Sequence, residues 1–287
     1  MALLAKLKRA SARSWTFHYE QILGTSLALR FRASSQAVAR QAEHVALTEI
    51  QCLAKIFSSY DPESELRRWQ GTTLLSSELA ELLLDSERWV ETTRGAFHPG
   101  VTAGREPLWR QETERMFTRL NQAVPLTLNA IAKGEIVDRV CDVVLASSES
   151  LFEVIVNIGG DLCVRGERPV EATVSGEAEN SPPLARVWLC NQALATSGSA
   201  RRGLHLHDPR TGQPVTHIAS ASVIAPRARV ADVLATAFCV LTIEESLALA
   251  ENEEGVACLL VTAEGEIVRS PRWADWEKKN AKETMGQ

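Results

Sequence analysis

The pattern of apolar residues changes near residue 150, and this change constrains the fold more than any other feature of the sequence. Upstream, apolar residues recur at helical spacing, whereas downstream they form short runs separated by turn residues. We predict helices over residues 35–57, 76–93 and 130–145. We predict strands over residues 152–158, 186–190, 194–196, 204–207 and 216–225. This order predicts an α+β protein with a mixed sheet and packed helices.

The first half of the chain also contains predicted strands, and the second half also contains a predicted helix. A bent strand pair is predicted over residues 16–32 around Gly24, and an apolar helix over 229–241 precedes a terminal hairpin over 255–262 and 266–269. The polar segment 105–126 shows no periodicity and is left unassigned. We expect one domain over residues 16–275, between a flexible leader (1–15) and a C-terminal tail (276–287).

Composition excludes several classes of function. The 287 residues carry a formal net charge of −5 and a pI near 5.8, so a nucleic-acid partner is not expected. No apolar run is long enough for a transmembrane segment. The six cysteines include no C-x-x-C pair, which favours small buried residues over zinc ligands and leaves disulfides open.

The N-terminus gives a first indication of the compartment. Basic residues are interleaved with Leu and Ala there, and the continuous apolar region of a signal peptide is missing. We therefore expect a cytoplasmic protein. A basic amphipathic start that touches a membrane surface is the alternative.

Two segments combine glycine with small polar residues. A predicted buried strand opens into Gly159, Gly160 and Asp161, where a ligand could approach the backbone closely, although a purely structural turn has the same pattern. Thr196, Ser197 and Gly198 end another predicted strand and could present N–H and O–H groups to phosphate.

Two further patterns offer a base and metal ligands. His205 and His207 alternate along a predicted strand, so only one of them can face a given site, and a structural histidine is the alternative. Asp232 and Thr236 are four residues apart on a predicted helix and share a face. Their oxygens suit Mg²⁺, while an Asp favoured by the helix dipole is the structural alternative.

Taken in order, these segments resemble the ApbE-like family of FAD:protein FMN transferases. The resemblance covers roughly residues 17–270. Eight motifs carry it: Gly-Thr at 24–25, Phe-Ser with Ser-x-Leu at 57–66, Thr-x-Gly-x-Phe at 93–97, Ile-Ala-Lys-Gly-x-x-x-Asp at 131–138, Asn-x-Gly-Gly-Asp at 157–161, Thr-Ser-Gly at 196–198, His-x-x-Asp-Pro-x-Thr-Gly at 205–212, and Ala-Asp-x-x-Ala-Thr at 231–236.

The resemblance implies a T-fold-like flavin transferase fold and a role for each matching residue. Asp232 and Thr236 would hold Mg²⁺ together with the backbone oxygen of Ala132. His205 would be the catalytic base, with Asp232 as the second catalytic residue. The FAD site would be lined by Lys133, Gly159, Gly160, Asp161, Thr196, Ser197 and Gly198.

The activity that the resemblance implies is Mg²⁺-dependent transfer of FMN from FAD to a threonine hydroxyl of an acceptor protein, with release of AMP. Hydrolysis of FAD to FMN and AMP is one alternative. A weakened FAD-binding module is another, because Gln70, His98, Asn129 and Ala130 depart from the family pattern. Family members often work outside the cytoplasm, which adds a periplasmic or membrane-associated location as an alternative.

Overall fold

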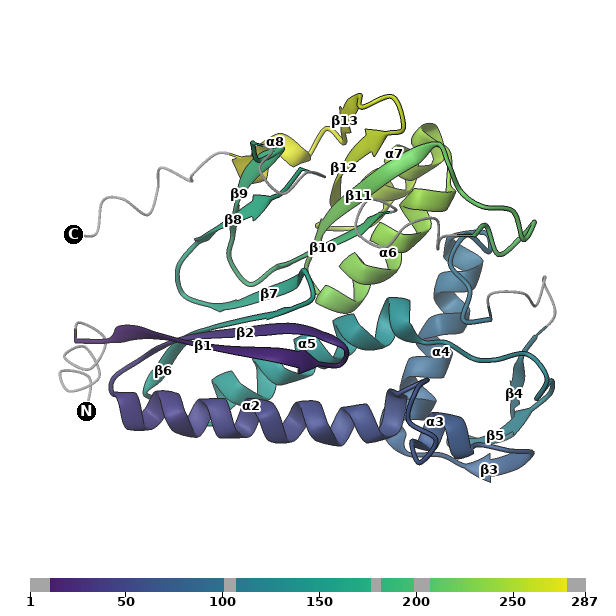
Figure 1. Cartoon of the computed structure of the whole chain (residues 1–287), viewed down its shortest axis with the longest axis horizontal. Helices are drawn as coiled ribbons and strands as arrows, with labels where there is room; N and C mark the ends of the chain where they lie inside the picture. Colours follow the sequence, from purple (N-terminus) through teal and green to yellow (C-terminus); the bar gives the residue numbers. More distant parts are fainter. Residues whose placement is uncertain (1–10, 101–106, 177–181, 199–206, 278–287) are drawn as a thin grey trace.

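An eight-stranded sheet forms the centre of the protein (Figure 1). The computed structural model describes residues 11–100, 107–176, 182–198 and 207–277. In spatial order, the strands are β1 (Arg13–Ile22), β2 (Thr25–Ala33), β6 (Leu151–Ile158), β7 (Asp161–Gly166), β10 (Ala193–Gly198), β11 (Ile218–Ala225), β12 (Ala257–Thr262) and β13 (Ile267–Arg269). The predicted α+β class is confirmed. The first strand begins at Arg13, inside the segment that was expected to be a leader.

Neighbouring strands of this sheet are all antiparallel, so the prediction of a mixed sheet was wrong. The reason lies in the connections. Ala33 at the end of β2 pairs with Leu151 at the start of β6. The long helical excursion between them therefore returns the chain to the end of the sheet from which it left, and the next strand must run in the opposite direction.

Three helices pack together against the sheet: α2 (Gln36–Phe57), α5 (Asn129–Ala146) and α6 (Ala228–Val240). The Oγ of Ser35 accepts a hydrogen bond from the N–H of Val38 at 3.3 Å and caps α2 at the predicted residue. Another predicted helix, α4 (Ser77–Thr92), is capped in the same way by Ser76. Helical periodicity and serine caps therefore predicted these helices to within a few residues.

Several of the elements that the sequence did not reveal are short. Thr72–Leu74 (β3), Met116–Arg119 (β5) and Trp109–Gln111 (β4) form a separate three-stranded sheet. A two-stranded sheet joins β8 (Val170–Val174), which was not predicted, to β9 (Ala185–Leu189), which matches the strand predicted over residues 186–190. The remaining helices are α3 (Glu65–Arg68), α7 (Ile243–Asn252) and α8 (Trp273–Glu277). Strands of three or four residues are too short to show a periodic pattern.

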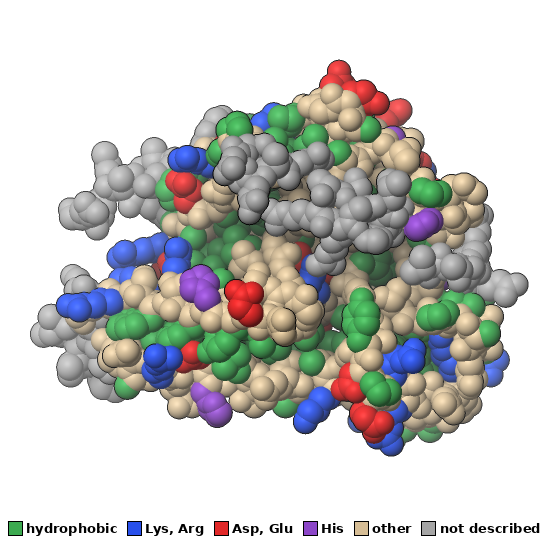
Figure 2. All heavy atoms as spheres, in the orientation of Figure 1, with side chains coloured by type: hydrophobic (Ala, Val, Ile, Leu, Met, Phe, Trp, Pro, Cys, Tyr) green, Lys and Arg blue, Asp and Glu red, His purple; other side chains and the backbone are tan. Residues whose placement is uncertain are grey.

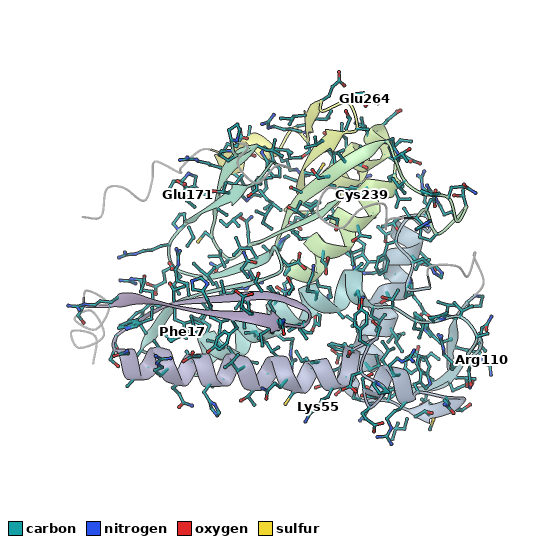
Figure 3. The ribbon with its side chains drawn as sticks, in the orientation of Figure 1. Phe17, Lys55, Arg110, Glu171, Cys239 and Glu264 are labelled. Carbon is teal, nitrogen blue, oxygen red and sulfur yellow. The ribbon has the colours of Figure 1, made fainter. Side chains whose placement is uncertain are left out.

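The core lies between the main sheet and the helices that cover it. On the face drawn in Figure 2, hydrophobic side chains also show between β1 and α2, where Phe17 lies in Figure 3. Its ring is 5.9 Å from that of Phe31 and 4.8 Å from the guanidinium of Arg40. Four cysteines are buried, Cys190 is partly buried and Cys52 is exposed. In the part of the chain that the structure describes, no helix is long and apolar enough to cross a membrane.

Candidate functional site

The site begins where α5 crosses the first turn of α6. Gly134 on α5 lies so close to α6 that a Cβ atom there would be 2.5 Å from the carbonyl oxygen of Ala228. A larger residue would force the two helices apart. Because they touch, the N–H of Gly134 donates a hydrogen bond to Asp232 Oδ2 at 3.2 Å. The glycine that follows Lys133 therefore positions the carboxylate of Asp232.

Two buried carboxylates share one lysine at this crossing. The side chains of Asp161 and Asp232 are 1% and 4% exposed. The Nζ atom of Lys133 lies 2.7 Å from Asp161 Oδ2 and 3.9 Å from Asp232 Oδ1. Burial, followed by the charge of Asp232, raises the pKa of Asp161 to about 8, although Lys133 acts in the opposite direction. Two acidic side chains thus lie together in a place where solvation is poor, and this disfavours loss of the Asp161 proton.

A divalent cation suits this arrangement. Asp161 Oδ1 is buried and accepts no hydrogen bond from the described residues, and such an oxygen is costly unless a cation or a donor satisfies it. Within the described ranges, no group of three or more His, Cys, Asp or Glu residues is arranged so that it could hold a metal ion. The other ligands of a metal ion would therefore have to be neutral oxygens, such as hydroxyls and carbonyls, which Mg²⁺ accepts.

One such hydroxyl belongs to Thr236, one turn beyond Asp232 on α6. Its Oγ1 atom lies 3.2 Å from Ser197 Oγ at the end of β10. Thr196 is next to Ser197, but successive side chains of a strand point to opposite faces. Its Oγ1 instead pairs with Ser222 Oγ across to β11 at 2.9 Å. The structure therefore places Ser197 beside α6 and turns Thr196 away from it.

A tight turn between β6 and β7 places Asp161. Gly159 and Gly160 have φ values of +60° and +104°, which favour glycine. The N–H of Gly160 donates to Asn157 Oδ1 at 3.0 Å. A Cβ on Gly159 would lie 2.7 Å from Thr25 Oγ1, whereas one on Gly160 would meet nothing within 4 Å. The backbone at Gly160 is thus open to the approach of a ligand.

Gly198, at the end of β10, has no such space. A Cβ there would lie 2.5 Å from the carbonyl oxygen of Ala219 on the neighbouring strand. The close packing of β10 against β11 therefore explains why residue 198 is a glycine.

The predicted base, His205, lies outside the described residues. His207 forms an isolated antiparallel bridge with Pro214. Between them, the N–H of Gly212 donates to the carbonyl oxygen of Asp208 at 2.7 Å, and the guanidinium of Arg210 pairs with the Asp208 carboxylate at 2.9 Å. The predicted turn over residues 208–212 is therefore confirmed, while the strand predicted over 204–207 falls mostly outside the described ranges.

Sequence reasoning did not assign a role to Asp138, the last residue of the Ile-Ala-Lys-Gly-x-x-x-Asp motif. Its side chain is fully buried, and its oxygens lie 3.1 Å from Arg165 Nη2 and 3.4 Å from Arg227 Nε. Oδ2 also accepts the N–H of Arg229, in the first turn of α6, at 3.0 Å. Asp138 thus fixes the start of the helix that carries Asp232. The available signal was its spacing, because a residue four positions after Gly134 shares its helix face.

Asn129, one of the departures from the family pattern, makes contacts of its own. Its Nδ2 atom donates to the hydroxyl of Tyr60 at 3.1 Å, and its Oδ1 atom accepts from Ser59 Oγ at 3.1 Å. The start of α5 is thereby tied to the turn that precedes α3.

Comparisons with known proteins identify relatives over most of the chain. The sequence profile of the ApbE family matches residues 23–119 and 107–260. The FAD:protein FMN transferase of Haemophilus influenzae is 28% identical over 272 residues, which cover 74% of this chain and 76% of the relative. The protein of the same name from Treponema pallidum is 32% identical over 158 residues, which cover 47% of this chain and 43% of the relative.

Solved structures show the same fold. The ApbE protein of Thermotoga maritima superposes with a TM-score of 0.80 at 24% identity, covering 93% of this chain and all (100%) of the other. The apo form of the Pseudomonas stutzeri flavinyl transferase ApbE gives a TM-score of 0.73 at 22% identity and covers 93% and 98% of the two chains.

Proposed function

The chain belongs to the ApbE family, and from this premise we propose that it is an FAD:protein FMN transferase. It would move the FMN half of FAD onto a threonine hydroxyl of an acceptor protein and release AMP. The observation that carries the proposal is the pair of buried carboxylates, Asp161 and Asp232, held around Lys133 beside an open glycine turn.

The diphosphate of FAD requires neutralisation of its charge before a hydroxyl can attack it. Asp232, Thr236 and the backbone oxygen of Ala132 would hold Mg²⁺, which when bound supplies that neutralisation. Asp161 Oδ1, which is buried and has no hydrogen-bond partner among the described residues, supports the presence of a cation in this region. Lys133 adds a positive charge of the protein itself.

The remaining residues would bind and orient the substrates. Gly160 leaves the backbone accessible at the β6–β7 turn, so its neighbourhood can accept a phosphate or flavin group. Ser197 lies beside Thr236 and offers a hydroxyl. His205 would take the proton of the attacking threonine while the threonine oxygen bonds to the phosphorus of the FMN half. The bond from that phosphorus to the bridging oxygen of the diphosphate breaks, and AMP leaves with the bridging oxygen.

The test is incubation of the protein with FAD, Mg²⁺ and a threonine-containing candidate acceptor, followed by mass analysis of the acceptor and of the nucleotides. We expect the acceptor to gain FMN and AMP to appear in equal amount. Free FMN with an unmodified acceptor would instead identify an FAD hydrolase. Binding of FAD without any product would identify a binding module.

The key variant is Asp232→Asn. An amide oxygen can still accept the hydrogen bond of Gly134, so the fold should be retained while the negative charge is lost. We expect turnover to be abolished, and a matched Asp275→Asn variant at an exposed position on α8 to behave like the unmodified protein. Full turnover by Asp232→Asn would contradict the assignment.

A further inference from the structure

A cavity lies between α3 and the segment that leads from β5 to α5. Figure 1 draws α3 and β5 at its lower right. Its volume is about 230 Å³, and its walls include Arg67, Trp69, Gln70, Arg119, Gln122 and Leu126. Neither Asp nor Glu is among the described residues that line it. None of the residues assigned to the flavin site lines it either.

Arg119 is the most unusual residue of this cavity. It is only 9% exposed, and its Nη1 atom is buried without a hydrogen-bond partner among the described residues. Nη2 donates to the carbonyl oxygen of Val124, and the guanidinium lies 5.8 Å from the centre of the Trp69 ring. Burial lowers the pKa of Arg119 to about 10, so the side chain remains a cation at neutral pH. Among the described residues, nothing satisfies this edge of a fixed, charged group.

Arg67 brings a second positive charge to the same cavity from α3. Its side chain is exposed, in contrast to that of Arg119. The next residue, Arg68, does not line the cavity, and its Nη1 atom lies 3.9 Å from Glu63. Of these two neighbouring arginines, only Arg67 lines the cavity.

A buried cation is normally paired, because an unpaired charge in a poorly solvated site is costly. The planar guanidinium of arginine matches the oxygens of a carboxylate or a phosphate. We propose that this cavity is a binding site for a small oxyanion, with Arg119 as its buried anchor and Arg67 at its mouth, separate from the flavin site.

The walls also limit the size and character of the ligand. The cavity is far larger than the roughly 30 Å³ that one water occupies in the liquid, and smaller than the pockets of about 300–1,000 Å³ that hold drug-sized molecules. Gln70 and Gln122 can donate and accept hydrogen bonds, while Trp69 and Leu126 supply apolar surface. A small metabolite that carries a carboxylate or a phosphate fits this description.

The experiment is calorimetric titration of the full chain with inorganic phosphate and, separately, with succinate, each at constant ionic strength maintained with chloride. We expect saturable binding of at least one of them. Replacement of a charged hydrogen-bond donor should weaken binding by about tenfold or more, so Arg119→Gln and Arg67→Gln should both bind less tightly. Arg68→Gln is the matched control and should bind as the unmodified protein does.

The pattern of binding identifies the ligand class. Binding of phosphate alone, of succinate alone or of both would assign the site to phosphates, carboxylates or oxyanions in general. If Arg119→Gln does not fold, Arg119→Lys replaces it in the titration, because lysine retains the charge without the planar guanidinium. In that case the comparison of Arg67→Gln with Arg68→Gln also decides whether the anion binds in this cavity. The proposal is overturned if neither anion binds, if Arg67→Gln binds as tightly as Arg68→Gln, or if saturating FAD displaces the anion.

Discussion

The amide nitrogen of Gly134 lies 3.2 Å from a carboxylate oxygen of Asp232, and this hydrogen bond joins the two helices of the proposed metal site. The contact exists because α5 has no side chain at that position. The same glycine thus sets the distance between the helices and orients the charged ligand.

Gly134→Ala should therefore destabilise the protein. The new Cβ would lie 2.5 Å from Ala228 O and 2.7 Å from the Cα of Arg229, both backbone atoms of α6. Such overpacking typically costs about 1–3 kcal/mol. Urea unfolding should show this loss, together with a drop in FAD turnover as Asp232 moves.

Gly265→Ala is the control for this substitution. A Cβ at Gly265 meets nothing within 4 Å, and its φ of +85° alone should cost about 1 kcal/mol. Its turnover should not change. Unaltered turnover in Gly134→Ala would mean that the helix spacing does not position Asp232.

Asp138 and Asp142 allow a comparison of a buried and an exposed acid on one helix. Both pair with Arg165 and Arg227, but their side chains are 0% and 42% exposed. Asp138→Asn should lower the free energy of unfolding by about 3–5 kcal/mol, because it removes the buried negative charge that balances the two arginines. Asp142→Asn should lower it by at most about 1 kcal/mol. Equal losses in chemical denaturation would contradict this ranking.

The two histidines test the assignment of the base. His205 matches the family motif, while His207 bridges to Pro214. A general base typically contributes about 10²–10⁴-fold in rate, so His205→Ala should lower FMN transfer by that order. His207→Ala should remain within a few-fold of the unmodified protein. A higher pH should partly restore the His205 variant, and equal losses in both variants would exclude His205 as the specific base.

The sequence predicted those parts of the fold and site that depend on local patterns. Periodicity and serine caps predicted α2 and α4, and the motif order brought together Lys133, Asp161 and Asp232, which the structure places in contact. Antiparallel pairing was missed because it depends on where a long excursion rejoins the sheet. Arg119 could not be assigned, because its contacts are made in the folded chain with residues such as Trp69, which lies 50 residues earlier in the sequence.

Tyr19 should titrate well above an ordinary tyrosine. Its hydroxyl donates to Glu43 Oε1, and burial together with that carboxylate raises its pKa from 10.0 to about 12. The chain has two tyrosines, so the ultraviolet absorbance of tyrosinate in a Tyr60→Phe variant reports Tyr19 alone. A midpoint near 10 would contradict the hydrogen bond.

The raised pKa of Tyr19 also makes the free energy of unfolding depend on pH. The folded protein retains the proton of Tyr19 at pH values where the unfolded chain has lost it, so the unfolded state binds fewer protons between about pH 10 and 12. The contribution of Tyr19 is therefore fully present below pH 10 and declines as the pH rises toward 12. The difference in unfolding free energy between the unmodified protein and Tyr19→Phe should shrink over this window.

The turn before Asp161 can be tested by a double-mutant cycle. Gly159→Ala suffers twice, because φ is +60° and the new Cβ lies 2.7 Å from Thr25 Oγ1 and 2.8 Å from Thr25 Cγ2. Gly160→Ala suffers only from its φ of +104°, since nothing lies within 4 Å. Gly159→Ala should therefore be the more destabilising, by about 1–3 kcal/mol. Thr25→Ala removes both contacting atoms. The double variant Thr25→Ala/Gly159→Ala should therefore recover most of the stability that the contact with Thr25 costs Gly159→Ala. Urea unfolding of the unmodified protein, the two single variants and the double variant would measure this coupling. Strictly additive losses would mean that Thr25 does not limit the space at Gly159, and that the early Gly-Thr motif has no part in shaping the turn that presents Asp161.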